Sequence, residues 1–436
     1  MSETTFVFTG DSFITRNLPK NGYAGLEAVK NIINRHDVRF NNLEITIHEN
    51  EGYPAAQSGG TWAMTSSEVL RDLASFGFNV FNTANNHSLD YSHGGLLATI
   101  ENLKKQSLPY CGTGGNLKEA SAPAYIETKN SKVAVIGVSA SSRSFEWAGN
   151  VSAETQGRPG LNPLRFATTY TVERALFDTL KKISEATNMN ARQFNSIKNG
   201  YAPPIADGKL YFGGLIFEVG EKNETRTTPL ERDMKRITAS IEDAKSKADY
   251  VVVSIHAHEE LNGKTEIPAE FLKTFSRTCI DSGADIIAGH GPHELRGIEI
   301  YNGKPIFYSI GNFIFQTETV EVQPADAYES LPPGIDIVSK LMNHRSKNGT
   351  VGYAVQPNIW RSALFGVTAE DGVIRQIQIY PITLHMDATV TDKGWPELMD
   401  GGDAAELLEY LAGLSKPFGT NLVVKHNIGI IDLEEY

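Results

Sequence analysis

Short runs of apolar residues alternate with longer amphipathic stretches through most of the 436-residue chain. Continuous apolar runs are typical of buried strands, and they occur at Phe6–Thr9, Val38–Phe40, Val80–Thr83, Val133–Val138, Tyr250–Ile255, Asp285–Ala288 and Pro305–Ile310. Helical periodicity predicts helices at Ser66–Phe76, Gly94–Gln106, Leu230–Lys247 and Pro268–Ser282. Strands that alternate with helices indicate an α/β fold, in which ligands bind at the carboxyl ends of the strands.

Two stretches interrupt this alternation, residues 142–224 and residues 317–357. Long segments of this kind in a compact domain are usually functional insertions. We therefore expect one domain, residues 1–385, that carries both stretches as insertions or lids. Residues 386–436, with a helical pattern at Ala404–Ala412, are expected to form a C-terminal extension that packs on this domain.

The composition narrows the possible partners. A chain with a formal net charge of −12 is poorly suited to binding nucleic-acid phosphates, so we expect no nucleic-acid partner. The two cysteines, Cys111 and Cys279, form no CxxC pair, and any metal is expected to be held by oxygen and imidazole nitrogen. No apolar stretch reaches the length of a transmembrane helix and no signal-peptide pattern is present, which favours a soluble, cytoplasmic protein without a membrane anchor.

Metal-ligating residue types follow five of the predicted strands. They are Asp11, then Asn42 and Glu44, then Asn85, Asn86 and His87, then His256 and His258, and finally His290 and His293. Each group alone is also compatible with a turn, a helix cap or a hydrogen-bonded core histidine. Together, carboxylates, a carboxamide and imidazoles at successive strand ends predict a site for one or two divalent cations of the Mn, Fe or Zn type.

The order of these residues resembles that of the calcineurin-like metallophosphoesterase superfamily. More closely it is similar to the CapA branch, which is named for bacterial poly-γ-glutamate capsule synthesis. The motifs that carry the resemblance are TGDSFITR, NLE, FNTANNHSLDYSHGGL, HAHEE and GADIIAGHGPHELRGIEIYNGKPIFYSIGNF, within Thr5–Ala140 and Ala248–Gln316. The resemblance implies a four-layer αββα sandwich of two mixed sheets, enlarged here by inserted loops or lids, with metals at its rim.

The resemblance also implies roles for individual residues. Asp11 and His293 would bind a first metal, and Glu44 would bridge it to a second. Asn86, His256 and His290 would bind the second metal, Asn86 through its amide oxygen. His87 matches the histidine that protonates the leaving group.

Two positions depart from the family pattern. Phe13 stands where the superfamily usually has a histidine ligand, so the number of metals, one or two, stays open. His258 stands where related sequences commonly have glycine, and Glu260 matches the glutamate of their His-x-Gly-x-Glu motif. His258 is either an extra ligand, a proton shuttle or a polar strand end, and we favour the last two.

Two arginines are candidates for binding an anionic small-molecule, γ-glutamyl or peptide substrate. Arg16 follows Asp11 as in the family's GDxxxxR pattern, and its planar fork suits a carboxylate or a phosphate. Its alternative role is a salt bridge that orients Asp11 or Glu44. Arg158 lies in the loop GRPGLN and is either a second anion-binding residue or an ordinary surface arginine.

Three functions are compatible with these residues. The first is a metal-dependent hydrolase that acts on a phosphoester or on a γ-glutamyl or peptide bond, with His87 as the proton donor. The second is a metal-dependent peptide epimerase, in which His87 works with His258 or Glu260. The third is a non-catalytic subunit that binds poly-γ-glutamate or its synthase. The sequence does not predict the oligomeric state.

Overall fold

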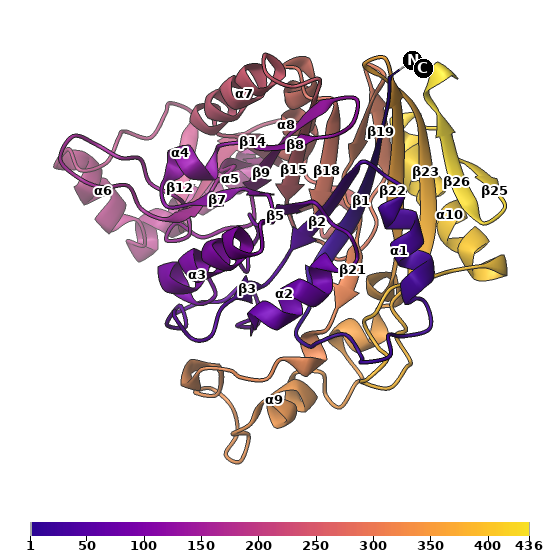
Figure 1. Cartoon of the computed structure of the whole chain (residues 1–436). Helices are drawn as coiled ribbons and strands as arrows, with labels where there is room; N and C mark the ends of the chain where they lie inside the picture. The colour runs from indigo at the N-terminus through magenta and orange to yellow at the C-terminus, as the bar shows by residue number, and fades with distance from the viewer. Residues whose placement is uncertain (1, 436) are drawn as a thin grey trace.

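A computed structural model describes residues 2–435 of the protein. Two large mixed β-sheets form its centre (Figure 1). The ten-stranded sheet has the order β25 (Val423–Lys425), β26 (Ile428–Asp432), β23 (Val373–Thr383), β22 (Arg361–Glu370), β1 (Glu3–Phe13), β2 (Val38–Leu43), β5 (Val80–Asn82) and β6 (Tyr110–Cys111). In addition, β21 (Asn312–Phe315) pairs with β1, and β24 (Glu397–Leu398) pairs with β23. The six-stranded sheet has the order β19 (Ile298–Tyr301), β20 (Lys304–Phe307), β18 (Ile286–His290), β15 (Tyr250–His256), β9 (Lys132–Ser139) and β8 (Ala124–Glu127).

The main hydrophobic core lies between these two sheets. Side chains alternate between the two faces of a strand, so Val252 of β15 packs into this central core, whereas Val253 packs on the opposite face. There, α7 (Glu231–Lys245) and α8 (Glu270–Asp281) cover the six-stranded sheet. On the outer face of the ten-stranded sheet lie α1 (Leu26–Asn34) and α2 (Ser67–Ala74), with α3 (Ser92–Lys105) beside them. The α/β class predicted from the sequence is therefore confirmed.

All seven predicted strands and all four predicted helices are present, with ends displaced by a few residues. The main difference at the N-terminus is that β1 continues to Phe13, so Asp11 lies inside a strand and not in a turn. Helix α1 was not predicted, although its buried residues follow helical spacing. The predicted strand that ends at Ile310 already ends at Phe307, because a turn leads from there into β21.

The first insertion forms a small layer of its own. It contains α5 (Arg174–Thr187), α6 (Ala191–Lys198) and a four-stranded sheet in the order β12 (Lys209–Phe212), β13 (Leu215–Val219), β11 (Phe166–Val172) and β14 (Glu224–Pro229). This sheet extends past the predicted boundary at residue 224. It is joined to the main body where Phe166 stacks on Phe271 of α8, with 4.2 Å between ring centroids.

The second insertion, residues 317–357, lies at one end of the molecule and is called the lid segment below (Figure 1). It contains α9 (Val338–Arg345) and the short 3-10 helices η1 (Thr317–Thr319), η2 (Ala325–Ala327) and η3 (Gly352–Val355). Residues 386–435 add β24, α10 (Gly401–Ser415), β25 and β26 to the edge of the ten-stranded sheet. Among the residues described, no helix has both the length and the apolar character needed to cross a bilayer.

Candidate metal centre

The register of the strands aligns the polar residues at one edge of both sheets. In the ten-stranded sheet, Asp11 pairs with Asn312 on one side and with Asn42 on the other. In the six-stranded sheet, His256 of β15 pairs with His290 of β18. Parallel strands place their carboxyl ends at the same edge, and the two rows therefore converge across the gap between the sheets.

A close approach of two backbone segments positions Asp11. The N–H of Asp11 donates to the carbonyl oxygen of Gly311, 2.9 Å away. A Cβ atom on Gly10 would lie 1.9 Å from that same oxygen, so any other residue at position 10 would push the segments apart. Gly311 itself has a φ of 76°, a conformation that glycine adopts without strain.

Hydrogen bonds then fix the carboxylate of Asp11. Its Oδ1 accepts from the side-chain amide of Asn42 at 2.7 Å, and its Oδ2 accepts from the N–H of Gly291 at 3.2 Å. The imidazole Nδ1 of His293 lies 3.5 Å from Oδ2, and that of His256 lies 3.8 Å from Oδ1. Burial opposes ionisation of Asp11, but the hydrogen bond with His293 and the nearby imidazoles lower the pKa of its carboxyl below the usual value.

Glu44 lies at the centre of the cluster with both carboxylate oxygens buried. Neither oxygen has a hydrogen-bond partner among the described residues. Its Oε1 lies 3.5 Å from Nε2 of His256, and its Oε2 lies 3.8 Å from Nδ1 of His293. Burial and the negative charges of Asp11 and Asp90 raise the pKa of Glu44 well above its usual value. A buried carboxylate without donors needs a proton or a cation to balance it.

Within residues 2–435, two groups of side chains are compact enough to hold a metal ion, and Glu44 belongs to both. The first consists of Asp11, Glu44 and His293, and the second of Glu44, His256 and His258. Burial lowers the pKa of His256 to about 3, so its ring is neutral and can offer a lone pair at physiological pH. The unpaired Glu44 oxygens and the neutral ring of His256 are oxygen and nitrogen donors that fit a divalent cation.

The structure places two more predicted ligands at the margin of this cluster. The amide nitrogen of Asn86 donates to the carbonyl of Gly59 at 2.9 Å, which leaves its buried Oδ1 without a partner in the described chain. The Nε2 atom of His290 is also buried and unpaired there. Burial lowers the pKa of His290 to about 4, although the charge of Asp11 opposes this. His290 lies outside both metal-sized groups.

Asn312 holds the ring of His293 in place. Its Oδ1 accepts a hydrogen bond from Nδ1 of His293 at 2.9 Å. Its amide nitrogen donates to the carbonyl oxygens of His293 and Ile359, at 3.2 and 3.0 Å. These two donated bonds fix the orientation of the amide and therefore of the imidazole, as outer partners of metal ligands commonly do.

His258 is closer to the metal-sized cluster than we expected. The Nε2 atoms of His256 and His258 lie 3.3 Å apart, and Glu44 completes the group. The ring of Phe13, where a histidine ligand is usual, instead packs edge-on against His87 with 5.1 Å between centroids. The two departures from the family pattern therefore lie in the same site. Phe13 removes one imidazole from it, and His258 adds another.

His87 forms a dyad with Asp90. Its Nδ1 lies 2.6 Å from Oδ2 of Asp90, and both side chains are buried. His87 also adds to the positive potential that lowers the pKa values of His256 and His258, after burial as the main cause. A carboxylate on Nδ1 fixes the tautomer and leaves Nε2 available for proton transfer.

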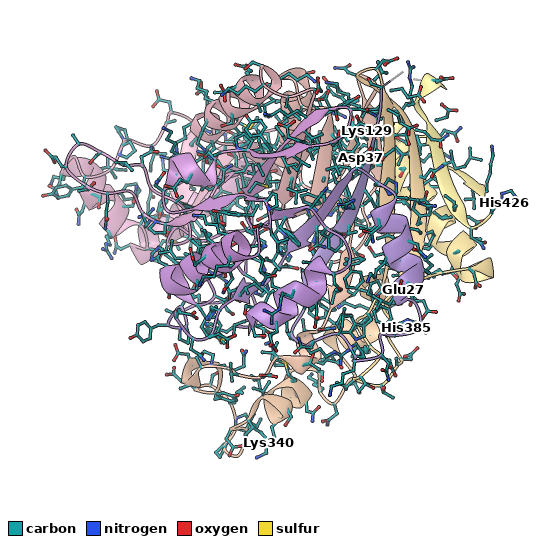
Figure 2. All side chains as sticks on the ribbon, viewed as in Figure 1. Glu27, Asp37, Lys129, Lys340, His385 and His426 are labelled. Atoms are coloured by element: carbon teal, nitrogen blue, oxygen red, sulfur yellow. The ribbon has the colours of Figure 1, made fainter. Side chains whose placement is uncertain are left out.

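Three predicted residues are not brought to the cluster. Arg16 donates through Nη2 to the carbonyl of Lys393 at 2.6 Å and through Nη1 to that of Val390. Arg158 is exposed and donates to the carbonyl of Trp147 at 3.0 Å. Glu260 is exposed on the short strand β16 (Glu260–Leu261). Figure 2 shows that His385 and His426, which lack the strand-end pattern, also lie at the periphery.

Sequence reasoning missed three side chains near the site. Arg143 lines a cavity of about 260 Å³ together with Asn86 and His258. Tyr353 of the lid segment packs edge-on against His293, with 5.9 Å between ring centroids. Arg345 of α9 donates to Thr61 Oγ1 at 2.7 Å, close to the Gly59 carbonyl that binds Asn86. No strand-end or spacing pattern marks any of the three.

Comparison with known proteins assigns the chain to a family. Residues 5–317 match the family model described as bacterial capsule synthesis protein PGA_cap. The chain is 29% identical over 439 residues to the uncharacterized protein y4sH of Sinorhizobium fredii, which covers 98% of this chain and 93% of that protein. It is 25% identical over 355 residues to the PGA biosynthesis protein CapA of Bacillus subtilis, covering 80% and 70%. It is 26% identical over 248 residues to the capsule biosynthesis protein CapA of Bacillus anthracis, covering 57% and 43%. Because the family model spans well over half of its residues, this chain belongs to the bacterial capsule synthesis protein PGA_cap family.

Proposed function

We propose that this protein is a metal-dependent hydrolase with a metallophosphoesterase-like αββα sandwich, acting on a phosphoester or on a γ-glutamyl or peptide-type bond. The observation that carries the proposal is the position of Glu44. Its two unpaired, buried oxygens face two separate sets of ligand side chains. A carboxylate shared in this way is the arrangement expected of a bridging ligand between two cations.

The reaction needs both activation and proton transfer. A bound divalent cation polarises the scissile group and lowers the pKa of water. Asp11, Glu44 and the strand-end imidazoles would hold that cation. Nε2 of His87 gives its proton to the departing oxygen or nitrogen, and Asp90 stabilises the charged and correctly oriented ring.

The surroundings suit an anionic substrate. Arg143 lines the cavity beside His258 and Asn86, and a guanidinium binds carboxylates and phosphates through paired hydrogen bonds. The names of the two Bacillus relatives link those proteins to PGA and capsule biosynthesis. We therefore place γ-glutamyl chains first among the substrates to test, ahead of phosphoesters.

Hydrolysis is favoured over epimerisation by the placement of the acid–base groups. Exchange of an α-proton requires two such groups on opposite sides of one carbon atom. Glu260 is exposed on β16, and His258 lies within a metal-sized group. This leaves His87, which suits one proton donation to a leaving group.

The deciding experiment combines metal analysis with two assays. The purified protein is loaded with Mn²⁺, Fe²⁺ or Zn²⁺ and incubated with an aryl phosphodiester and, separately, with γ-linked glutamyl oligomers. We expect cleavage of one substrate, lost in Glu44→Gln and His87→Ala and kept in His426→Ala, a control at the hairpin tip (Figure 2).

The same experiment can contradict the proposal. Deuterium incorporation from heavy water into a peptide without cleavage would instead identify an epimerase. A protein that holds metal and binds γ-glutamyl oligomers tightly, but neither cleaves nor epimerises them, would be a binding subunit.

A further inference from the structure

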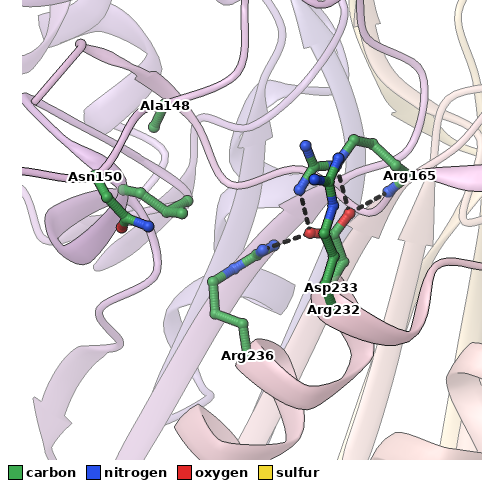
Figure 3. Close-up of a pocket in the computed structure, with 7 residues that line it drawn as sticks. Ala148, Asn150, Arg165, Arg232, Asp233 and Arg236 are labelled. Carbon is green, nitrogen blue, oxygen red and sulfur yellow. Dashed lines mark hydrogen bonds and ion pairs between the residues drawn. The ribbon is translucent and has the colours of Figure 1, made fainter. Parts of the chain in front are cut away.

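A second cavity, of about 440 Å³, is lined by three arginines and one aspartate. Arg165, Arg232 and Arg236 surround Asp233, with Ala148 and Asn150 on the opposite wall (Figure 3). None of the residues that line this cavity also lines the cavity beside His258. Its volume falls in the range of small-molecule binding sites.

Asp233 is fully buried and uses both of its oxygens. Oδ2 accepts from the backbone N–H of Arg165 at 2.9 Å and from its Nε at 2.7 Å. Oδ1 accepts from Nη2 of Arg165 and from Nη1 of Arg236, each at 2.6 Å. The carboxylate is thus saturated and neutralises one positive charge, which leaves the cavity wall with a net charge of about +2 from its three arginines.

The side chains of Arg165 and Arg236 are held in position before any ligand arrives. The guanidinium of Arg165 stacks on the ring of Trp147, 4.8 Å from its centroid. Arg236 donates through Nε to the side-chain oxygen of Asn162 at 3.2 Å and through Nη2 to the carbonyl of Pro163. Donors that are already fixed lose little entropy when they bind an anion.

The remaining positive charge has no counterpart in the described chain. Arg232 is exposed at the start of α7 and has no hydrogen bond or ion pair with any described residue. Burial, together with the positive charges of Arg165 and Arg232, lowers the pKa of Arg236 even though Asp233 opposes this. The chain as a whole carries a net charge of −12, whereas the residues that line this cavity carry a net positive charge.

We propose that this cavity binds a dianionic oxyanion group, either a phosphate or a pair of neighbouring carboxylates. The guanidinium fork of Arg232, which has no partner among the described residues, matches both groups through paired, charge-assisted hydrogen bonds. Arg165 and Arg236 form the fixed floor, and Arg232 closes over the ligand from the helix. This site is separate from the metal centre and does not depend on the reaction proposed above.

Binding is tested directly with full-length protein by titration calorimetry. Inorganic phosphate and glutarate are the two probes, and they distinguish a phosphate ligand from a dicarboxylate ligand. Each titration is done on the metal-loaded protein and again after chelation, because phosphate bound at the metal centre is lost on chelation. Arg232→Ala is the test variant, since its side chain makes no described contact that folding would need.

Lys235→Ala is the matched control. Lys235 lies on the same helix and its removal changes the charge equally, but it pairs with Glu231 and does not line the cavity. We expect saturable binding of at least one probe to chelated protein, at least tenfold weaker in Arg232→Ala and unchanged in Lys235→Ala. Absence of saturable binding after chelation, or an equal loss in both variants, would overturn the proposal.

Discussion

Nδ1 of His87 lies 2.6 Å from Oδ2 of Asp90, and the backbone holds this carboxylate from the other side. Asp90 accepts from the N–H of Gly59 at 2.8 Å and from the N–H of Ala63 at 2.9 Å. The aspartate is therefore fixed independently of His87. It sets the tautomer of the imidazole in the way that a catalytic triad orients its base.

Asp90→Asn is expected to lower kcat by about 10²- to 10⁴-fold, because an amide at this position favours the wrong tautomer of His87. Metal content is expected to stay at the wild-type value, since Asp90 belongs to neither metal-sized group. The kcat of His87→Ala, and that of the variant carrying both substitutions, should be at most slightly lower than the kcat of Asp90→Asn. Loss of metal in Asp90→Asn would mean that the dyad supports the ligands and not the proton transfer.

His258→Ala separates the roles that the sequence left open. If His258 is a ligand with Glu44 and His256, its removal is expected to weaken binding of one ion by about 10- to 100-fold, as measured by metal analysis after dialysis. The pH dependence of any remaining activity should then keep its shape. A variant with full metal content but an altered pH profile would identify His258 as a proton shuttle.

Arg345→Ala is expected to loosen the lid segment. Arg345 donates to Thr61 Oγ1 at 2.7 Å and to the carbonyl of Gly60 at 3.1 Å, both outside the lid segment. We expect faster limited proteolysis within residues 317–357 and a KM raised by about tenfold, the effect of one charge-assisted contact. Lys340→Ala is the control, because the bonds that Lys340 makes to described residues stay within the same segment, at Gly334 and Asp336 (Figure 2). Equal proteolysis of both variants would show that Arg345 does not anchor the lid segment.

Glu146 makes stability depend on pH. Burial raises its pKa from 4.5 to about 7, although Arg143 donates its N–H to the carboxylate. Between about pH 4.5 and 7 the folded state therefore keeps a proton that the unfolded state releases, so the free energy of unfolding falls as pH rises through this range. Between these pH values, the ionisation of Glu146 lowers the free energy of unfolding by about 3 kcal/mol, and above about pH 7 this loss no longer changes with pH.

Glu146→Gln should remove this part of the pH dependence. The free energy of unfolding of wild type and variant is measured by urea unfolding at pH 5 and at pH 8. The other titrating groups contribute equally to both proteins, so the difference in free energy between the two proteins reports Glu146 alone. The variant is expected to gain stability relative to wild type on going from pH 5 to pH 8. A difference that does not change with pH would mean that Glu146 is ionised throughout.

The part of the site that could be predicted from the sequence depends on the strands. A buried parallel strand has a recognisable apolar run, and its register places the residue after the run at the shared edge. For this reason Asp11, Glu44, His256 and His293 lie together as the pattern indicates. The helices that cover the sheets were predictable for a related reason, since a single apolar face repeats every three to four residues.

The rest depends on contacts that no local pattern encodes. Arg16 is directed away from the cluster by carbonyl groups of residues 390 and 393, which lie in the C-terminal extension. The motif match did not place Glu260 at the cluster, because β15 ends at His256 and Glu260 begins the separate short strand β16. Tyr353 comes from an aperiodic segment, and its position depends on long-range contacts such as the ring contact with His293 and the hydrogen bond from Trp360 Nε1 to its carbonyl at 2.8 Å.

The pairing of Asp11 with Asn312 has a consequence for how the protein is made. Strand β1 is synthesised some 300 residues before β21, which completes the turn at Gly311 and supports His293. Until residues 256–293 have been synthesised, Asp11 and Glu44 lack their imidazole partners. The group of Asp11, Glu44 and His293 therefore lacks the support of Asn312 until translation has passed β21, whereas the group of Glu44, His256 and His258 does not involve this strand. A product truncated before β21 would keep the second group of candidate ligands but lose the support of the first.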